Sequence, residues 1–213
     1  LLIGEVAWAG SSLSSADEWL ELWNLGDTPL DLSGYRLEGA SASPIVFDQA
    51  HVIAPQSAFL IANYDASDEK SSIATTTHLV STAVSLSNST LSLRLFDAND
   101  VLVDELPSDT PPAGSSSPKA TMIRSALDMA WLSATTTNFM KTDITDLGTP
   151  GFCDGCEPLV PSEPPELTLP SLEERTTDSG VALATSTEEI IEDVSEIPKI
   201  KTTTTTEELI ETE

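Results

Sequence analysis

The sequence predicts an all-β fold, an antiparallel β-sandwich followed by a disordered acidic tail. Short apolar or alternating segments recur about every 8 to 12 residues with turn residues between them, and helical periodicity is absent before residue 153. All 11 aromatic residues lie at or before Phe152. Because aromatic side chains supply much of the area that a core buries, we expect a folded domain at residues 1–152 and a Pro/Glu/Thr-rich linker or stalk at residues 153–213.

The first predicted strands are short and separated by turns. Residues 3–8 form an apolar run that ends at a Ser-rich loop. Residues 18–24 alternate, which places Leu20 and Leu22 on one face of a strand and Trp19, Glu21 and Trp23 on the other. After a turn at residues 26–29, further strands are predicted at residues 30–33, 35–38, 45–47 and 58–62.

The clearest supersecondary signal is a β-hairpin over residues 90–105. Leu91, Leu93 and Leu95 alternate with polar residues, and residues 97–100 (Asp-Ala-Asn-Asp) form a loop rich in side chains that tolerate turn geometry. Residues 101–103 are apolar and return along the first strand. The last strand is predicted at residues 120–124, and Trp131 and Phe139 are expected to fold back onto the core.

The tail contains one candidate helix. Ser186 and Glu189 have the spacing of a capping box, and an apolar stripe follows that ends at Pro198: Ile190, Ile191, Val194 and Ile197. A helix of about 11 residues is marginal in water. The segment is therefore either part of a disordered acidic linker with transient helicity or a docking segment that folds on a partner.

The charge of the chain restricts its partners. The net charge is −26, and the 19 acidic and six basic residues up to Phe152 give half of it. Such a field repels phosphates and anionic lipid headgroups, so nucleic acid and membrane surfaces are not expected as direct partners. No apolar run approaches the roughly 18 residues of a transmembrane helix. The chain begins at Leu1 and not at Met, which a removed signal peptide would explain.

Cys153 and Cys156 are the only cysteines. A redox dithiol would sit at a helix N-terminus within a βαβ pattern, which is absent. A structural zinc site needs about four ligands, and this pair supplies two. A small disulfide at the exit of the domain, two inert thiols, and metal or redox use are the three alternatives.

No catalytic constellation appears in the sequence. The only histidines, His51 and His78, lack metal-ligand spacing, and the chain has no Gly-x-Ser-x-Gly elbow, phosphate loop or dinucleotide fingerprint. Both histidines are expected at the surface or at a strand edge. We therefore predict no catalytic residues and no enzyme activity for this chain.

Calcium is the one small ligand for which the sequence gives a signal. Two loops carry clustered oxygen ligands, with Asp97, Asn99 and Asp100 in one and Asp65, Asp68 and Glu69 in the other. Calcium takes about 6 to 8 such ligands, and the first loop lacks the remaining oxygens of an EF-hand. Turn preference alone also explains its Asp and Asn residues. No other cofactor is expected.

Trp19, Glu21 and Trp23 form the candidate partner surface. If their strand face is open, two aromatic rings flank a carboxylate, an arrangement suited to a carbohydrate or a protein partner. If another segment of the chain covers them, the same residues form a second core layer, and large exposed apolar patches are uncommon on monomers. The sequence leaves both alternatives open.

The order of these elements resembles the lamin tail domain. The similarity is carried by six stretches: residues 3–8 (Ile-Gly-Glu-Val-Ala-Trp), 17–24 (Asp-Glu-Trp-Leu-Glu-Leu-Trp-Asn), 30–37 (Leu-Asp-Leu-Ser-Gly-Tyr-Arg-Leu), the hairpin at 91–105, Trp131, and 148–151 (Gly-Thr-Pro-Gly). It spans the predicted domain and none of the tail. The Glu-Trp-x-Glu-Leu-x-Asn block followed by Asp-Leu-Ser-Gly-aromatic is its most specific part.

The resemblance implies an immunoglobulin-like sandwich that interacts with other molecules and catalyses nothing. In bacteria such domains occur on exported proteins, so an extracellular or cell-surface location on the acidic stalk is the expectation, with an unidentified protein or surface polymer as partner. The alternative is an accessory domain of a larger secreted nuclease or phosphatase. Lamin tails are credited with binding DNA through basic surface, which the −13 charge of this domain argues against.

The same motif has a physical interpretation. Leu20 and Leu22 would point into the core, and residues 31–34 would form a tight bend. In that bend the Asp31 and Ser33 side chains satisfy backbone donors, while Gly34 takes a conformation that other residues adopt at a cost. The motif is therefore expected to determine the fold and not to carry chemistry.

Overall fold

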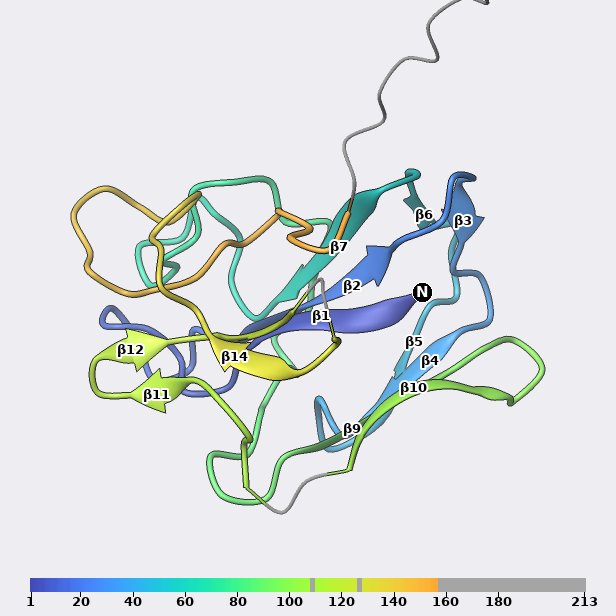
Figure 1. The fold of residues 1–213 in the computed structure, drawn as a ribbon, viewed down its shortest axis with the longest axis horizontal. Coiled ribbons are helices and arrows are strands. Elements are labelled where there is room, and N and C mark those ends of the chain that lie inside the picture. Colours follow the sequence, from blue (N-terminus) through green and yellow to red (C-terminus); the bar gives the residue numbers. More distant parts are fainter. Residues whose placement is uncertain (108–109, 126–127, 157–213) are drawn as a thin grey trace, which may run out of the picture. The chain divides into compact units, whose positions relative to one another are not determined.

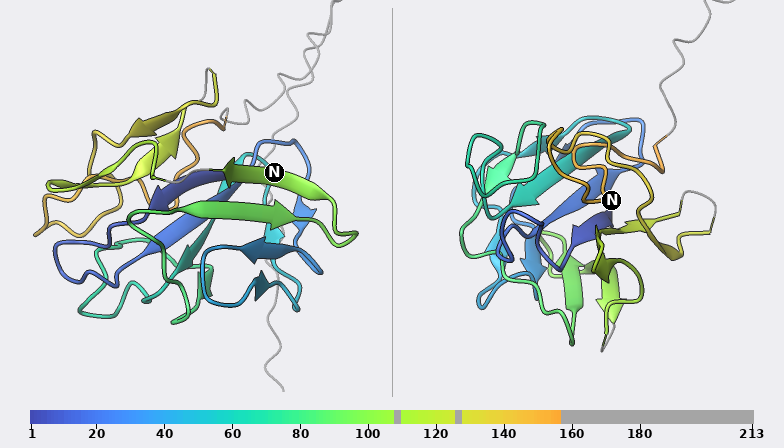
Figure 2. Two further views of the ribbon diagram at one scale, coloured as in Figure 1. Left: turned by 90° about the horizontal axis from the view of Figure 1, so that it is seen from below. Right: turned by 90° about the vertical axis from the view of Figure 1, so that its left-hand side faces the viewer.

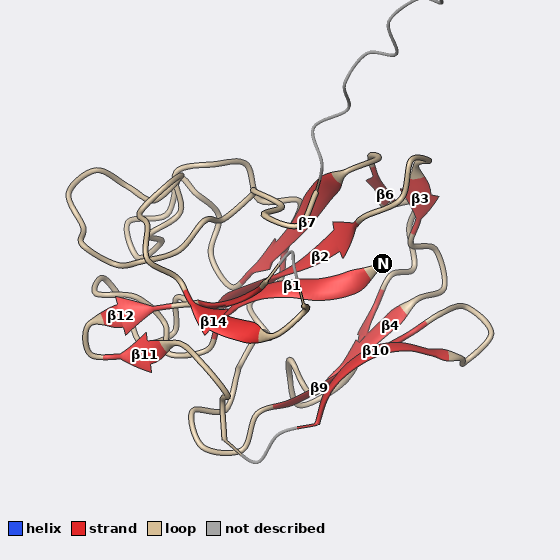
Figure 3. Ribbon diagram, in the orientation of Figure 1, coloured by secondary structure: helices blue, strands red, loops and turns tan. Residues whose placement is uncertain are grey.

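The computed structural model describes residues 1–107, 110–125 and 128–156, and within them the chain forms strands and no helix (Figure 3). The larger sheet has six strands, in the order β14 (Trp131–Ser133), β13 (Met122–Arg124), β1 (Leu2–Ala7), β2 (Trp19–Asn24), β7 (Ser57–Ala62) and β8 (Leu79–Val80). The second sheet has four, in the order β10 (Leu102–Pro107), β9 (Ser92–Phe96), β4 (Arg36–Glu38) and β5 (Ile45–Val46).

Two small sheets complete the described part, one from β11 (Ser115–Ser116) and β12 (Lys119–Ala120), the other from β3 (Leu30–Asp31) and β6 (Val52–Ile53). Every pairing between the named strands is antiparallel except that of β7 with β8, and an isolated parallel bridge joins Ala120 to Leu147. The two main sheets lie in separate layers (Figure 1). The all-β prediction is confirmed, and the architecture is consistent with an immunoglobulin-like fold.

The main core lies between the two large sheets. Leu20 and Leu22 of β2 are fully buried there, together with Leu93 and Leu95 of β9. Alternation along a strand sends every second side chain to the same face, which is why these leucines meet in one layer. The predicted hairpin is also present, because β9 pairs with β10 in antiparallel register.

The six-stranded sheet is covered on its outer face as well. Trp19 packs there with Leu60, Ile73 and Met140, and a neighbouring cluster holds Trp23 with Cys153. In the right-hand view of Figure 2, the orange segment near the end of the described chain lies on one side of β1 and β2, and green strands of the four-stranded sheet lie on the other. All six residues of β2 are therefore buried.

Trp23 is accommodated because the residue beside it in β1 has no side chain. A Cβ on Gly4 would lie 2.0 Å from the Trp23 indole. The β1–β2 register also shifts between Ile3 and Glu5, next to this contact. Gly4 thus lets a large indole lie directly against the backbone of the neighbouring strand.

The bend after β3 has the predicted chemistry. The Ser33 amide donates to Asp31 Oδ1 at 2.9 Å, and the Ser33 hydroxyl donates to the same oxygen at 2.7 Å. Gly34 has a φ of 83°, in the region that favours glycine. The bend directs the chain from the small sheet into β4.

Asp104 of β10 joins the two large sheets. Its Oδ2 accepts the Ile3 amide of β1 at 2.8 Å, and its Oδ1 accepts from the Arg124 guanidinium of β13 at 3.1 Å. Both side chains of this ion pair are largely buried. The pair therefore fixes the edge of one sheet against strands of the other.

Some expectations from the sequence differ from the structure. Trp131 packs against the main core as predicted, but Phe139 is 51% exposed and stacks on Phe152 with ring centroids 6.1 Å apart. The expectation that Phe139 returns to the core was wrong, because β14 ends before it and the chain then runs over the surface. The candidate helix at residues 186–198 lies outside the described residues.

Candidate functional site

Two carboxylates face each other inside the outer layer. Glu5 of β1 is the register partner of Glu21 of β2, and both are fully buried. Burial raises the pKa of the Glu5 carboxyl above its ordinary value. Burial raises the pKa of Glu21 further, with the neighbouring Glu5 charge as a second cause. Both carboxyls therefore release their protons less readily than exposed glutamates do.

These two carboxylates hold the last described segment of the chain, residues 148–156, which we call the C-terminal strap. The Thr149 amide donates to Glu5 Oε1 at 2.9 Å, and its hydroxyl donates to Oε2 at 2.6 Å. The Gly151 amide donates to Glu21, which also accepts from the Trp23 indole at 2.9 Å. The carboxylates thus act as hydrogen-bond acceptors for a strap that crosses the sheet.

The other polar residues of the stretch 17–24 also form hydrogen bonds with loops of the same chain. Asp17 accepts the Ser72 amide at 2.7 Å, and Glu18 accepts the Leu86 amide at 2.8 Å. Burial raises the pKa of Glu18 to about 7. Asn24 donates to the Thr28 carbonyl at 2.8 Å and accepts the Gly26 amide. The motif therefore uses its polar groups to fasten the chain to itself.

Trp19, Glu21 and Trp23 do not form an open strip. Their exposed fractions are 1%, 0% and 1%. The C-terminal strap and the segment around Ile73 cover that strand face. Of the two alternatives, the open partner surface is therefore wrong, and the three residues belong to a second core layer. The covering segments lie far along the chain from β2, so the alternation of residues 18–24 could not reveal them.

The candidate calcium loops fold their own turns. Asp97 accepts the amides of Asn99 and Val101 at 2.8 and 2.9 Å, and Asp100 pairs with Arg36. Asp65 and Asp68 accept amides within their own loop, while Glu69 is exposed. In residues 1–107, 110–125 and 128–156, no three His, Cys, Asp or Glu side chains gather as a metal site. Calcium binding stays a prediction without geometric support there.

Both histidines pack on Phe59. The ring centroids of His51 and His78 lie 5.5 and 5.1 Å from that of Phe59. His78 also caps the edge of β7, because its Nδ1 accepts the Leu60 amide at 3.0 Å and its own amide donates to the Leu60 carbonyl. Burial lowers the pKa of His78, in agreement with a neutral ring that accepts at Nδ1.

Cys153 and Cys156 are joined in a disulfide, the first of the three alternatives for this pair. Cys153 is buried against Trp23, and the ring that the disulfide closes ends the C-terminal strap. The disulfide thus closes the chain at the point where the described part of the domain ends.

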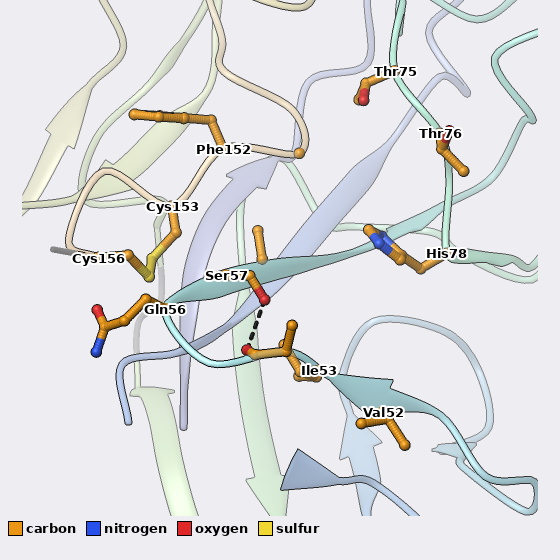
Figure 4. Close-up of a pocket in the computed structure, with 13 residues that line it drawn as sticks. Val52, Ile53, Gln56, Ser57, Thr75, Thr76, His78, Phe152, Cys153 and Cys156 are labelled. Atoms are coloured by element: carbon orange, nitrogen blue, oxygen red, sulfur yellow. Dashed lines mark hydrogen bonds between the residues drawn. A yellow bond between two sulfur atoms is a disulfide. The ribbon is translucent and has the colours of Figure 1, made fainter. Parts of the chain in front are cut away.

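A groove of about 640 Å³ lies beside the disulfide (Figure 4). Its lining comes from β6 and the turn after it, the start of β7, residues 75–78, and the C-terminal strap. Val52 and Phe152 are 56% and 44% exposed within it. The sequence did not point to this site, since β6 is only two residues long and Phe152 served only to mark the end of the predicted domain.

Comparison with known proteins identifies a family for this chain but no individual related protein. The model of the family described as Lamin Tail Domain matches residues 1–108, just over half of the 213-residue chain. The match contains β1 to β10 and ends before Trp131 and residues 148–151, which the sequence resemblance had included. No curated protein and no solved structure matches the chain. No helix in the described part of the chain is long and apolar enough to cross a membrane.

Proposed function

Because the chain belongs to the lamin tail domain family, we propose that it is an exported, non-catalytic interaction module, displayed at a cell surface or in an extracellular assembly. The partner is a protein or a surface polymer. The acidic residues 153–213 serve in this proposal as the stalk that separates the domain from its anchor or neighbour.

The observation that carries the proposal is that the polar side chains of residues 17–24 bond to the chain's own backbone. Asp17, Glu18 and Glu21 are buried and accept hydrogen bonds from backbone amides of other segments. A catalytic acid or base must instead reach a substrate in an accessible cleft. The motif that defines the family therefore builds a rigid platform, and the surface that it supports is left for binding.

The disulfide supports the exported part of the proposal. Disulfides persist in oxidising compartments and are rare in proteins kept in a reducing cytosol. Cys153 and Cys156 account for every cysteine of the chain, and both are in the disulfide. The mass of the chain isolated from its host, with and without reductant before thiol alkylation, tests this directly. Alkylation without reductant would contradict an oxidising compartment.

Labelling of intact cells tests export and display. A membrane-impermeant biotin reagent is applied to cells that produce the full-length protein, and a cytosolic protein of the same cells serves as the control. We expect the chain to be labelled through its lysines while the control stays unlabelled. Labelling of the chain only after the cells are broken would contradict the proposal.

An accessory domain of a larger secreted hydrolase is the second candidate. In this candidate the chain contributes binding, and a further domain of the same protein carries out the hydrolysis. The full-length reading frame separates the two candidates, because only this one requires a catalytic domain next to residues 1–213.

A further inference from the structure

The outer edge of β7 is only partly occupied. Along β7, the backbone amide and carbonyl of successive residues point alternately toward β2 and away from it. Those of Leu60 point away from β2, since they bond to His78. Ala58, two residues earlier, faces outward in the same way. No residue in the described part of the chain bonds to the Ala58 amide or carbonyl. The first half of β7 therefore has a backbone amide and a carbonyl without a partner at Ala58. This residue is only 7% exposed, and that exposure is toward the groove beside the disulfide, which Ala58 lines.

The groove has an apolar wall on each side of this edge. Val52 and Ile53 of β6 lie on the side of the main core, and Phe152 with Cys153 lies on the side of the outer layer (Figure 4). A strand added at the edge of a sheet points successive side chains to opposite faces. One residue of an added segment would therefore contact Val52, and its neighbours would contact Phe152 and the disulfide.

The charges around the groove indicate which kind of added segment would bind best. None of the groove's lining residues is acidic or basic except His78, whose ring stacks on that of Phe59. Three exposed aspartates adjoin the lining. Asp31 is the register partner of Val52, Asp154 follows Cys153, and Asp27 follows Gly26, whose carbonyl accepts from Gln56. An uncharged groove whose lining residues have acidic neighbours complements an apolar segment flanked by basic residues.

We propose that the groove binds an extended protein segment with an apolar centre and Lys or Arg on both flanks, which pairs with the amide and carbonyl of Ala58 as an added strand. This mode gives affinity through main-chain hydrogen bonds and specificity through the side-chain walls. The proposal rests on the function proposed above and names the partner class for it. It is independent of where the protein is located.

The test is a titration of the full ¹⁵N-labelled chain with two synthetic peptides, followed by NMR. The first is Ac-Lys-Val-Val-Val-Lys-NH2, and the second has Glu in place of both Lys residues. We expect the Lys-flanked peptide to shift the amide signals of Ser57, Ala58 and His78 and to bind roughly tenfold more tightly at low salt. Equal binding of both peptides, or shifts confined to other strands, would overturn the proposal.

Matched variants show whether the groove itself binds. Val52→Ser removes an exposed apolar wall of the groove, and Val46→Ser removes a valine of equal exposure, 55% against 56%, on the edge strand β5. Both variants are expected to fold, because each valine is more than half exposed. Val52→Ser should weaken binding of the Lys-flanked peptide roughly fivefold, and Val46→Ser should leave it unchanged. Equal effects would contradict the assignment to this groove.

Two other occupants would also overturn the proposal, and the same samples detect them. If residues beyond Cys156 fill the groove, the Ala58 amide exchanges slowly in the free chain and neither peptide shifts it. If a second copy fills it, the Ala58 signal depends on protein concentration. Absence of peptide binding defeats the groove assignment alone, since cell-surface labelling decides the proposed function separately.

Discussion

Thr149 donates twice to one buried carboxylate, and Gly151 donates to its neighbour. A buried acceptor that loses its donor costs more than an ordinary hydrogen bond contributes, because it cannot recover a water molecule. At the scale of single residues, the domain therefore depends on a few buried carboxylates whose partners come from distant parts of the chain.

Thr149→Val tests this dependence. The valine keeps the shape and the backbone amide but removes the hydroxyl that donates to Glu5 Oε2. We expect the free energy of unfolding in urea to fall by about 1–3 kcal/mol. Thr149→Ser, which retains the hydroxyl, is the control and should lose clearly less. Equal losses in the two variants would mean that the hydrogen bond contributes nothing.

Glu18 gives a prediction for pH. Its pKa is about 7 in the folded state against an ordinary 4.5, so the folded domain binds a proton more tightly than the unfolded chain. Stability contributed by this group is complete below pH 4.5 and is lost as the pH rises through 7. Glu18→Gln keeps an acceptor for the Leu86 amide and cannot ionise, so its stability relative to the native chain should rise by about 1 kcal/mol per pH unit between pH 5 and 7.

The comparison between variant and native chain isolates Glu18 from other titrating groups. Glu5 and Glu21 have raised pKa values and act in the same direction, while the lowered pKa of His78 acts in the opposite direction below its ordinary 6.5. Glu69→Gln, at an exposed loop position, is the matched control. Urea unfolding from pH 5 to pH 8 provides the values. A difference that does not change with pH would contradict the assignment.

At the scale of elements, the long strands and the short strands β3, β4 and β5 were predictable from the sequence, whereas β6 and β8 were not. β2, β7 and β9 have five or six residues with apolar or alternating patterns, and such periods can be recognised in a sequence. β6 and β8 have two residues each. Their pairing depends on contacts such as that of His78 with Leu60, which no local pattern encodes.

The polar residues of the site followed the same division. The bend at residues 31–34 was predictable, because Asp31, Ser33 and Gly34 act on their own neighbours. The hydrogen-bond partner of Glu5 was not predictable, because Thr149 lies 144 residues away in the sequence. Glu5 does carry one local signal that could have been used, an acidic residue inside an otherwise apolar strand, which indicates a buried and partnered carboxylate.

The link between the two large sheets gives a prediction for β10. Asp104→Ala removes the acceptor for the Ile3 amide and leaves Arg124 without its ion-pair partner. We expect a loss of about 1–3 kcal/mol in the free energy of unfolding. Glu105→Ala, the exposed neighbour on the same strand, should change stability by less than about 0.5 kcal/mol. Similar losses for both would argue against a link through Asp104.

At the scale of the whole molecule, charge separates this chain from a DNA-binding member of its family. The net charge is −26, and 19 acidic residues face six basic ones up to Phe152. Protein affinity for DNA comes largely from neutralised phosphates. We expect no shift of labelled duplex DNA by the full chain at low salt, where such binding is strongest. A basic DNA-binding protein run beside it is the control, and a shift by the chain at micromolar concentration would contradict the charge argument.

Amide hydrogen exchange of the full chain, followed by NMR, tests the central claim most directly. That claim is that buried carboxylates hold the C-terminal strap on the sheet while the amide and carbonyl of Ala58 in β7 stay without a hydrogen-bond partner. The amides of Thr149 and Gly151 should exchange as slowly as those of β2, and the Ala58 amide should exchange far faster than that of Leu60. Fast exchange at Thr149 and Gly151, or equal protection of Ala58 and Leu60, would contradict it.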